Sequence, residues 1–171
     1  MEDLIYCQED IPKEQWRYGF RSSAATGCGW IATYNALRLM GRRAEPEELI
    51  RYYEHRFPLV HGNCGTTILA PAFYFQKKGY TVEWTSCYDR FDDLAKSSDV
   101  CILYYRWIKK WKYGAHFVCL HHRENGFVGY NTYRNSKGPD RYGESLEKYI
   151  KDRKLFGAVL ISIRKPGGEK K

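Results

Sequence analysis

The 171-residue chain has no Cys-x-x-Cys pair and no continuous apolar run near the ~18 residues that span a membrane. Nor does the acidic segment after Met1 contain an apolar stretch of the length that a signal peptide requires. The six cysteines are dispersed along the chain, which excludes the usual spacings of zinc sites and of disulfide frameworks. We therefore expect a cytoplasmic protein that works in a reducing compartment without a membrane partner.

Acidic residues are in the minority, and the formal net charge is +8. The basic residues are dispersed, apart from a cluster at 106–112 and a Lys-rich tail after Arg164, and no nucleic-acid-binding motif accompanies them. We expect no nucleic-acid partner. The cluster alternates cations with Trp107 and Trp111, which leaves an RNA-binding accessory role as an alternative. A polar hairpin that leads to His116 and forms the rim of a cleft is favoured for this segment.

The length predicts one domain over residues 1–171, with 1–19 as an N-terminal extension and 164–171 as a flexible tail. Apolar residues three and four apart predict a helix over 28–40. A second helix is expected to begin near 45 with Pro46 in its first turn, and a third is expected over 68–78, capped by Thr66 or Thr67. The first half of the chain is therefore expected to be helical.

The second half turns to short β-prone runs, with one short helix near 91–95. The runs are at 80–84, 100–105, 116–121, 126–130 and 156–163. This pattern predicts an α+β fold in which a helical half packs on an antiparallel β-sheet. The pair Asn125-Gly126 predicts a hairpin that brings His116 and Asn131 to the same end of two neighbouring strands.

Cys28 is flanked by glycines at the start of the first predicted helix. Unpaired N–H groups and the helix dipole at that position favour thiolate over thiol. Gly27 and Gly29 remove side chains on both sides, which we expect to admit a substrate backbone and to expose N–H groups to an oxyanion. The alternative is that Cys28 is a small apolar residue that packs beneath the helix.

The chain order cysteine, histidine, asparagine is typical of thiol-nucleophile enzymes. An amide beside the His116 imidazole would set its tautomer while the other ring nitrogen faces the sulfur. Two alternatives remain open. Cys64, also followed by glycine, is a second candidate nucleophile, and strand alternation puts His122 on the face of His116, where a metal site is conceivable.

Four segments together resemble the papain-like cysteine peptidases of the C39-like group, over residues 20–163. They are Gly-Cys28-Gly at a helix start, Gly65-Thr-Thr before a helix and strand, Gly114-Ala-His116-Phe-Val, and a strand that ends in Gly129-Tyr-Asn131. The resemblance implies a papain-like fold with Cys28 as nucleophile, His116 as general base and then acid, and Asn131 as the orienting residue. It also implies a peptide or protein substrate and no metal or organic cofactor.

The chain departs from that family at the glutamine that normally precedes the cysteine by about six residues, because Ser22 stands there. The expected oxyanion donors are therefore a hydroxyl of Ser22 or Ser23, Gln15 brought back by a loop, and the backbone N–H of Cys28. Two further functions remain open: an acyltransferase or amidase that uses the same triad, and an inactive scaffold that binds a peptide or protein partner.

Overall fold

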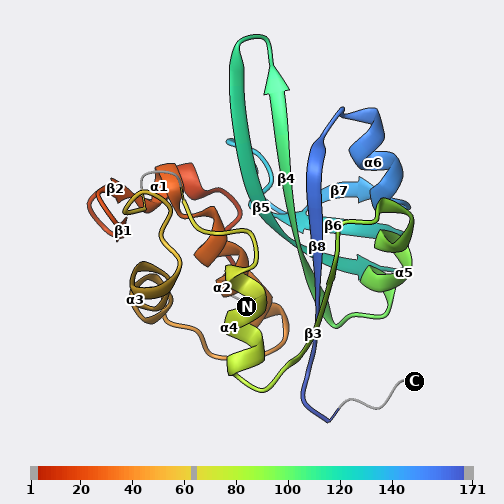
Figure 1. Cartoon of the computed structure of the whole chain (residues 1–171), viewed down its shortest axis with the longest axis horizontal. Helices are drawn as coiled ribbons and strands as arrows, with labels where there is room; N and C mark the ends of the chain where they lie inside the picture. Colours follow the sequence, from red (N-terminus) through yellow and green to blue (C-terminus); the bar gives the residue numbers. More distant parts are fainter. Residues whose placement is uncertain (1–3, 63–64, 168–171) are drawn as a thin grey trace.

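The computed structural model describes residues 4–62 and 65–167 and has an α+β fold with helices on both faces of an antiparallel sheet (Figure 1). The N-terminal part contains η1 (Gln8–Asp10), β1 (Arg17–Tyr18), β2 (Arg21–Ser22), α1 (Ser23–Thr26), α2 (Cys28–Leu39), α3 (Pro46–Arg56) and α4 (Ala70–Lys77). The remainder contains β3 (Thr81–Thr85), η2 (Tyr88–Arg90), α5 (Phe91–Lys96), β4 (Val100–Lys109), β5 (Lys112–Arg123), β6 (Gly126–Tyr130), β7 (Asp140–Gly143), α6 (Leu146–Asp152) and β8 (Phe156–Arg164). The α+β class predicted from the sequence is confirmed.

The predicted helices over 28–40 and from 46 onward are confirmed as α2 and α3. The third, α4, begins at Ala70 rather than at 68, and neither threonine caps it. Thr66 instead donates its hydroxyl to the carbonyl of Phe57 over 2.9 Å, and Thr66 also forms an isolated β-bridge with Pro58. Thr66 therefore holds the segment between α3 and α4 in place.

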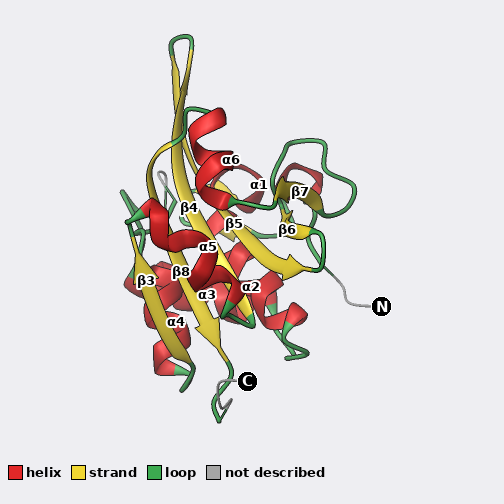
Figure 2. Ribbon diagram, turned by 90° about the vertical axis from the view of Figure 1, so that its right-hand side faces the viewer, coloured by secondary structure: helices red, strands yellow, loops and turns green. Residues whose placement is uncertain are grey.

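The six-stranded sheet is antiparallel throughout and has the order β3-β8-β4-β5-β6-β7. Alternating side chains serve two cores, because successive residues of a strand face opposite sides. Ile102, Phe117 and Cys119 belong to the core shared with α2, α3 and α4, whereas Val118 and Leu120 belong to the core under α5 and α6. Figure 2 shows α5 and α6 on the face of the sheet away from the other helices.

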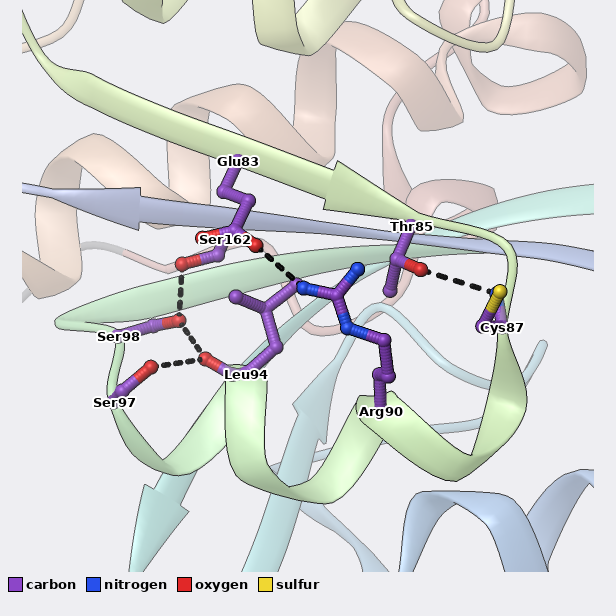
Figure 3. Close-up of polar contacts among 8 residues, drawn as sticks. All are labelled: Glu83, Thr85, Cys87, Arg90, Leu94, Ser97, Ser98 and Ser162. Atoms are coloured by element: carbon purple, nitrogen blue, oxygen red, sulfur yellow. Dashed lines mark hydrogen bonds and ion pairs between the residues drawn. The ribbon is translucent and has the colours of Figure 1, made fainter.

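Polar contacts hold α5 at the edge of the sheet (Figure 3). Arg90, just before α5, makes an ion pair with Glu83 of β3 at 2.8 Å. At the other end of the helix, the hydroxyls of Ser98 and Ser162 are hydrogen-bonded over 2.6 Å, and the hydroxyl of Ser97 donates to the carbonyl of Leu94. These contacts connect α5 to β3 and β8, the two strands farthest from β5 on that side.

The sequence did not predict β7, α6 or the place of β8 between β3 and β4. The segment at 106–114, in contrast, is a hairpin as predicted, in which β4 and β5 continue to Lys109 and Lys112. The hairpin between β5 and β6 is also confirmed, with Arg123 opposite Gly126. Figures 1 and 2 show the β4–β5 hairpin projecting well beyond the rest of the sheet.

The segment predicted as an N-terminal extension packs on the core from residue 4 onward. The buried side chain of Asn35 in α2 accepts from the N–H of Ile5 and donates to its carbonyl, at 2.9 and 2.8 Å. The thiol of Cys7 donates to the carbonyl of Arg134. At the other terminus, residues 168–171 of the predicted tail lie outside the described residues. Among the described helices, none has the length and apolar character needed to cross a membrane.

We expect Asn35→Ala to lower the free energy of unfolding by about 1–3 kcal/mol, because both backbone groups of Ile5 lose their partner. Urea unfolding measures the change, and hydrogen exchange should show faster exchange of the Ile5 amide. Asn135→Ala, at an exposed loop residue, is the control and should leave both values unchanged. Equal stability of the two variants would show that the N-terminal segment is not held by this contact.

Candidate active site

Cys28 begins α2 directly beside β5. Burial raises the pKa of its thiol, while backbone hydrogen bonds from Phe117, Gly29 and Cys28 itself act in the opposite direction. The net shift is upward, so the resting group is a neutral thiol. The N–H groups favour the thiolate in the direction that the sequence indicates, but the desolvation of the charged form outweighs them.

Gly27 and Gly29 have packing roles. A Cβ at Gly29 would lie 2.3 Å from Cγ2 of Thr66, and one at Gly27 would lie 2.6 Å from both the Ser23 carbonyl oxygen and Nε1 of Trp30. The space beside each glycine is thus filled by protein, in place of the substrate backbone that the sequence analysis expected there. Both glycines allow the start of α2 to approach its neighbours closely.

His116 and Asn131 are brought together, but through a different atom from the one predicted. Nε2 of His116 donates to the backbone carbonyl of Asn131, not to its carboxamide. Asn131 adopts a left-handed backbone conformation with φ of 62° directly after β6, which turns this carbonyl toward β5. Because Nε2 carries the proton, Nδ1 is left as the basic nitrogen. Burial lowers the pKa of His116, although the bond to Asn131 opposes that shift, so the ring is neutral at pH 7.

The carboxamide of Asn131 is held by Gln8. The N–H of Gln8 donates to Oδ1 of Asn131 at 2.7 Å, and Nδ2 of Asn131 donates to Oε1 of Gln8 at 3.2 Å. Nε2 of Gln8 in turn donates to the carbonyl of Ala24 in α1, at 3.0 Å. Gln8 therefore connects α1, which directly precedes the cysteine, with the residue that orients the histidine. Sequence reasoning missed this role; its only signal is that Gln8 and Gln15 are the two glutamines upstream of Cys28.

The three other expected oxyanion donors are placed differently. The hydroxyl of buried Ser23 accepts from Nε1 of Trp30 at 3.1 Å. Ser22 ends β2 and is the N-cap residue of α1, half-buried and without a side-chain capping bond. Gln15 is exposed and lines a separate pocket with Ser136 and Lys137. The donors that act on the sulfur are instead backbone N–H groups, those of Phe117 in β5 and of Gly29 and Cys28 at the start of α2.

A cleft of about 800 Å³ opens beside Cys28, between the helical part and the sheet. Its walls are mostly apolar, and Phe73 and Trp84 are 49% and 50% exposed there. Exposed large apolar side chains around a concave site are typical of ligand-binding surfaces. Arg106, whose Nε donates to the hydroxyl of Tyr104 over 2.9 Å, is the one charged residue among those that line the cleft in the described part of the chain.

His116 faces the other side of β5, while its neighbours Ala115 and Phe117 line the cleft. Its ring makes an edge contact with Tyr105, directly opposite on β4, and burial raises the pKa of Tyr105 to about 12, which keeps the phenol protonated. Sequence reasoning missed Tyr105, although the paired β-prone runs carried the signal. Among residues 4–62 and 65–167, no hydrogen bond joins the Cys28 thiol to the imidazole; such bonds often form only when substrate binds.

The alternative metal site receives no support from the described geometry. His122 does share the face of His116, but its ring packs against Phe127 with centroids 5.0 Å apart. Within the described ranges, no group of three or more His, Cys, Asp or Glu side chains is arranged to hold a metal ion. Cys64, the second candidate nucleophile, lies outside the described residues.

No protein-family model matches the chain. No curated protein sequence matches it either. The chemistry of the site therefore has to be argued from its own geometry.

We expect Gln8→Ala to free the carboxamide of Asn131 and to loosen the bond between His116 and the Asn131 carbonyl. Nitrogen-15 NMR of the imidazole should show a shifted or broadened Nε2–H signal of His116. Gln15→Ala is the matched control and should leave that signal as in the wild type. An unchanged spectrum in the Gln8 variant would exclude Gln8 as a positioning residue.

The raised pKa of Cys28 predicts slow alkylation at neutral pH. The pH at which half of Cys28 is reactive toward iodoacetamide should lie above the ordinary thiol value of about 8.5. Peptide mass spectrometry measures this, with exposed Cys87 as the reference thiol in the same sample. A midpoint for Cys28 well below 8.5 would show instead a resting thiolate–imidazolium pair.

Proposed function

We propose that the protein is a thiol-dependent amide hydrolase of the papain-like type, with a peptide or isopeptide bond as substrate. The hydrogen bond from Nε2 of His116 to the Asn131 carbonyl carries this proposal. This bond fixes the tautomer of His116 in which Nδ1 is the basic nitrogen. His116 is next to Phe117, and the N–H of Phe117 interacts with the sulfur of Cys28. Cys28 and the His116–Asn131 pair thus adjoin neighbouring residues of β5, which supports the triad that the sequence resemblance implies.

In the proposed mechanism both reacting groups start neutral. As the sulfur of Cys28 attacks the carbonyl carbon, Nδ1 of His116 takes the thiol proton, and the Asn131 carbonyl stabilises the resulting imidazolium through Nε2–H. The N–H groups at the start of α2 stabilise the oxyanion. The imidazolium then gives its proton to the departing amine. Water, deprotonated by His116, hydrolyses the thioester and restores the thiol.

The apolar cleft supports a substrate with bulky apolar groups near the reacting bond. His116 carries out every proton transfer in these steps, so no step is assigned to a metal or an organic cofactor. An acyl acceptor other than water would make the same thioester chemistry an acyltransferase or amidase. A cytoplasmic, reducing location remains a prediction and is compatible with a free catalytic thiol.

The raised pKa of the Cys28 thiol favours a second candidate, a papain-like scaffold that binds a peptide in the cleft without cleaving it. The filled space at Gly27 and Gly29 points the same way, because it leaves less room around the sulfur. Binding of a peptide by the wild type without release of product would favour this scaffold.

We expect Cys28→Ser and His116→Ala each to lower turnover of a peptide library by at least about 100-fold, because each removes a group that reacts. Product release by mass spectrometry measures turnover, and a thioester adduct should map to the peptide with Cys28. Cys87→Ser, at an exposed thiol that does not line the cleft, is the matched control and should keep wild-type turnover. Cys64→Ser separates the two candidate nucleophiles, and loss of activity in that variant alone would overturn the assignment.

Because burial lowers the pKa of His116, we expect the acid limb of kcat/KM to fall below the ordinary histidine value of about 6.5. Activity is present where the imidazole is neutral and is lost as the pH drops through its lowered pKa. Initial rates between pH 4 and 8 measure the limb. A limb above 6.5 would contradict a neutral imidazole of lowered pKa as the working base.

A further inference from the structure

The outer edge of β5 is free along the half of the strand that leads to the site. Pairing with β6 begins at Cys119, so residues from Lys112 to Val118 have no strand partner on that side within the described chain. The N–H of Phe117 is directed to the Cys28 sulfur and therefore away from β4. Backbone groups alternate in direction along a strand, so those of Tyr113 and Ala115 point to the same open side.

The projecting hairpin formed by 106–114 carries cations that nothing in the described structure neutralises. Lys109 and Lys112 are directly opposite each other across the hairpin, an arrangement that is unfavourable for two like charges. Neither these residues nor Lys110 takes part in an ion pair among the described residues. Moreover, no acidic residue occurs between Asp99 and Glu124. The hairpin thus lacks a partner of negative charge.

The same hairpin exposes large apolar side chains on the face that continues the cleft. Ile108 and Tyr113 form a cross-strand pair and are 65% and 61% exposed. This pair follows Arg106 and Ala115, which line the cleft beside Cys28. The lysines at 109 and 112 lie on the opposite face, because their cross-strand pair is the next one along the hairpin. Lysines alone would protect an open strand edge from pairing, but exposed Ile, Trp and Tyr side chains do the opposite.

We propose that the free edge of β5 binds an extended polypeptide segment as an added strand, with apolar side chains toward the cleft and acidic side chains toward Lys109 and Lys112. The backbone groups of Tyr113 and Ala115 supply the pairing, and the segment runs toward Cys28. A strand repeats every two residues, so the preferred segment alternates apolar and acidic residues. Cleavage of the bound segment depends on the proposed hydrolase function, whereas its binding does not.

A nucleic acid is a weaker match to the same surface. It would use the lysines and stack on exposed rings such as Trp111, but it would not use a row of backbone donors and acceptors or a continuous apolar face. The open strand edge, contiguous with the cleft, is the observation that favours a polypeptide. The experiment therefore includes a nucleic-acid arm.

The test uses the full chain with Cys28→Ser, so that binding is measured without turnover. The probe is a fluorescent synthetic peptide of about eight alternating Leu and Glu residues, the length of a typical strand. A peptide of the same composition in two blocks, Leu then Glu, is the control probe. We expect the alternating peptide to bind at least about tenfold more tightly than the block peptide, and equal affinities would overturn the proposal.

Ala115→Pro is the decisive variant, because proline removes one outward N–H and is tolerated at a strand edge. Ala115→Ser keeps the N–H and is the matched control. We expect the proline variant to lose at least about tenfold in affinity and the serine variant to bind as before, with equal melting temperatures. Lys112→Glu tests the charge separately and should weaken binding by a similar factor. Unchanged affinity in the proline variant would exclude an added strand.

The outcomes for binding and for hydrolysis are separable. Binding by the Cys28→Ser protein, together with no turnover by the wild type, would retain the docking surface and remove the hydrolase. If the wild type turns over peptides but its Cys28→Ser form binds both probes equally, the hydrolase is retained and the docking surface is removed. A thymidine oligonucleotide that binds more tightly than the alternating peptide, with unchanged affinity in Ala115→Pro, would replace the polypeptide by a nucleic acid.

Discussion

The contact between the N-terminus of α2 and the edge of β5 determines how the helical part and the sheet meet. At this contact the N–H of Phe117 is directed to the sulfur of Cys28, and the missing side chain of Gly29 leaves room for Thr66. Burial at such a tight contact disfavours a charged sulfur more than the nearby N–H groups favour it. The position that gives Cys28 its neighbours therefore also sets its protonation state, and the proposed chemistry begins from a neutral pair.

Asn131 acts through its backbone: its conformation ends β6, and its carbonyl accepts the hydrogen bond from His116. Its left-handed conformation ends β6 and turns its carbonyl toward His116, while Gln8 occupies its carboxamide. Asparagine is among the few side chains that adopt this conformation readily. The same bend stops the pairing of β6 with β5, so one backbone angle both orients the histidine and leaves the edge of β5 open. Orientation of the base and access for a strand are thus linked.

The parts of the fold that the sequence predicted are those governed by local periodicity. The helix over 28–40, the start at Pro46 and the β5–β6 hairpin follow from spacings of three, four and two residues and from one turn signal. The roles of Gln8 and of the Asn131 carbonyl could not be predicted in this way. Gln8 and Asn131 are 123 residues apart, and their contact depends on where long-range packing puts each segment. The protonation of Cys28 was missed because burial is a property of the folded molecule, not of a helix start.

The place of β8 also has a consequence for the order in which the molecule can form. This strand comes last along the chain, yet it lies between β3 and β4. On a ribosome, β3 and β4 emerge well before the strand that separates them, and β4 with β5 can already close their long hairpin. The open side of that hairpin is then exposed while the sheet is incomplete. Synthesis of β8 thus marks the moment at which the core beneath the site becomes continuous, and a nascent chain that stalls before it would carry unpaired strands on both sides of the gap.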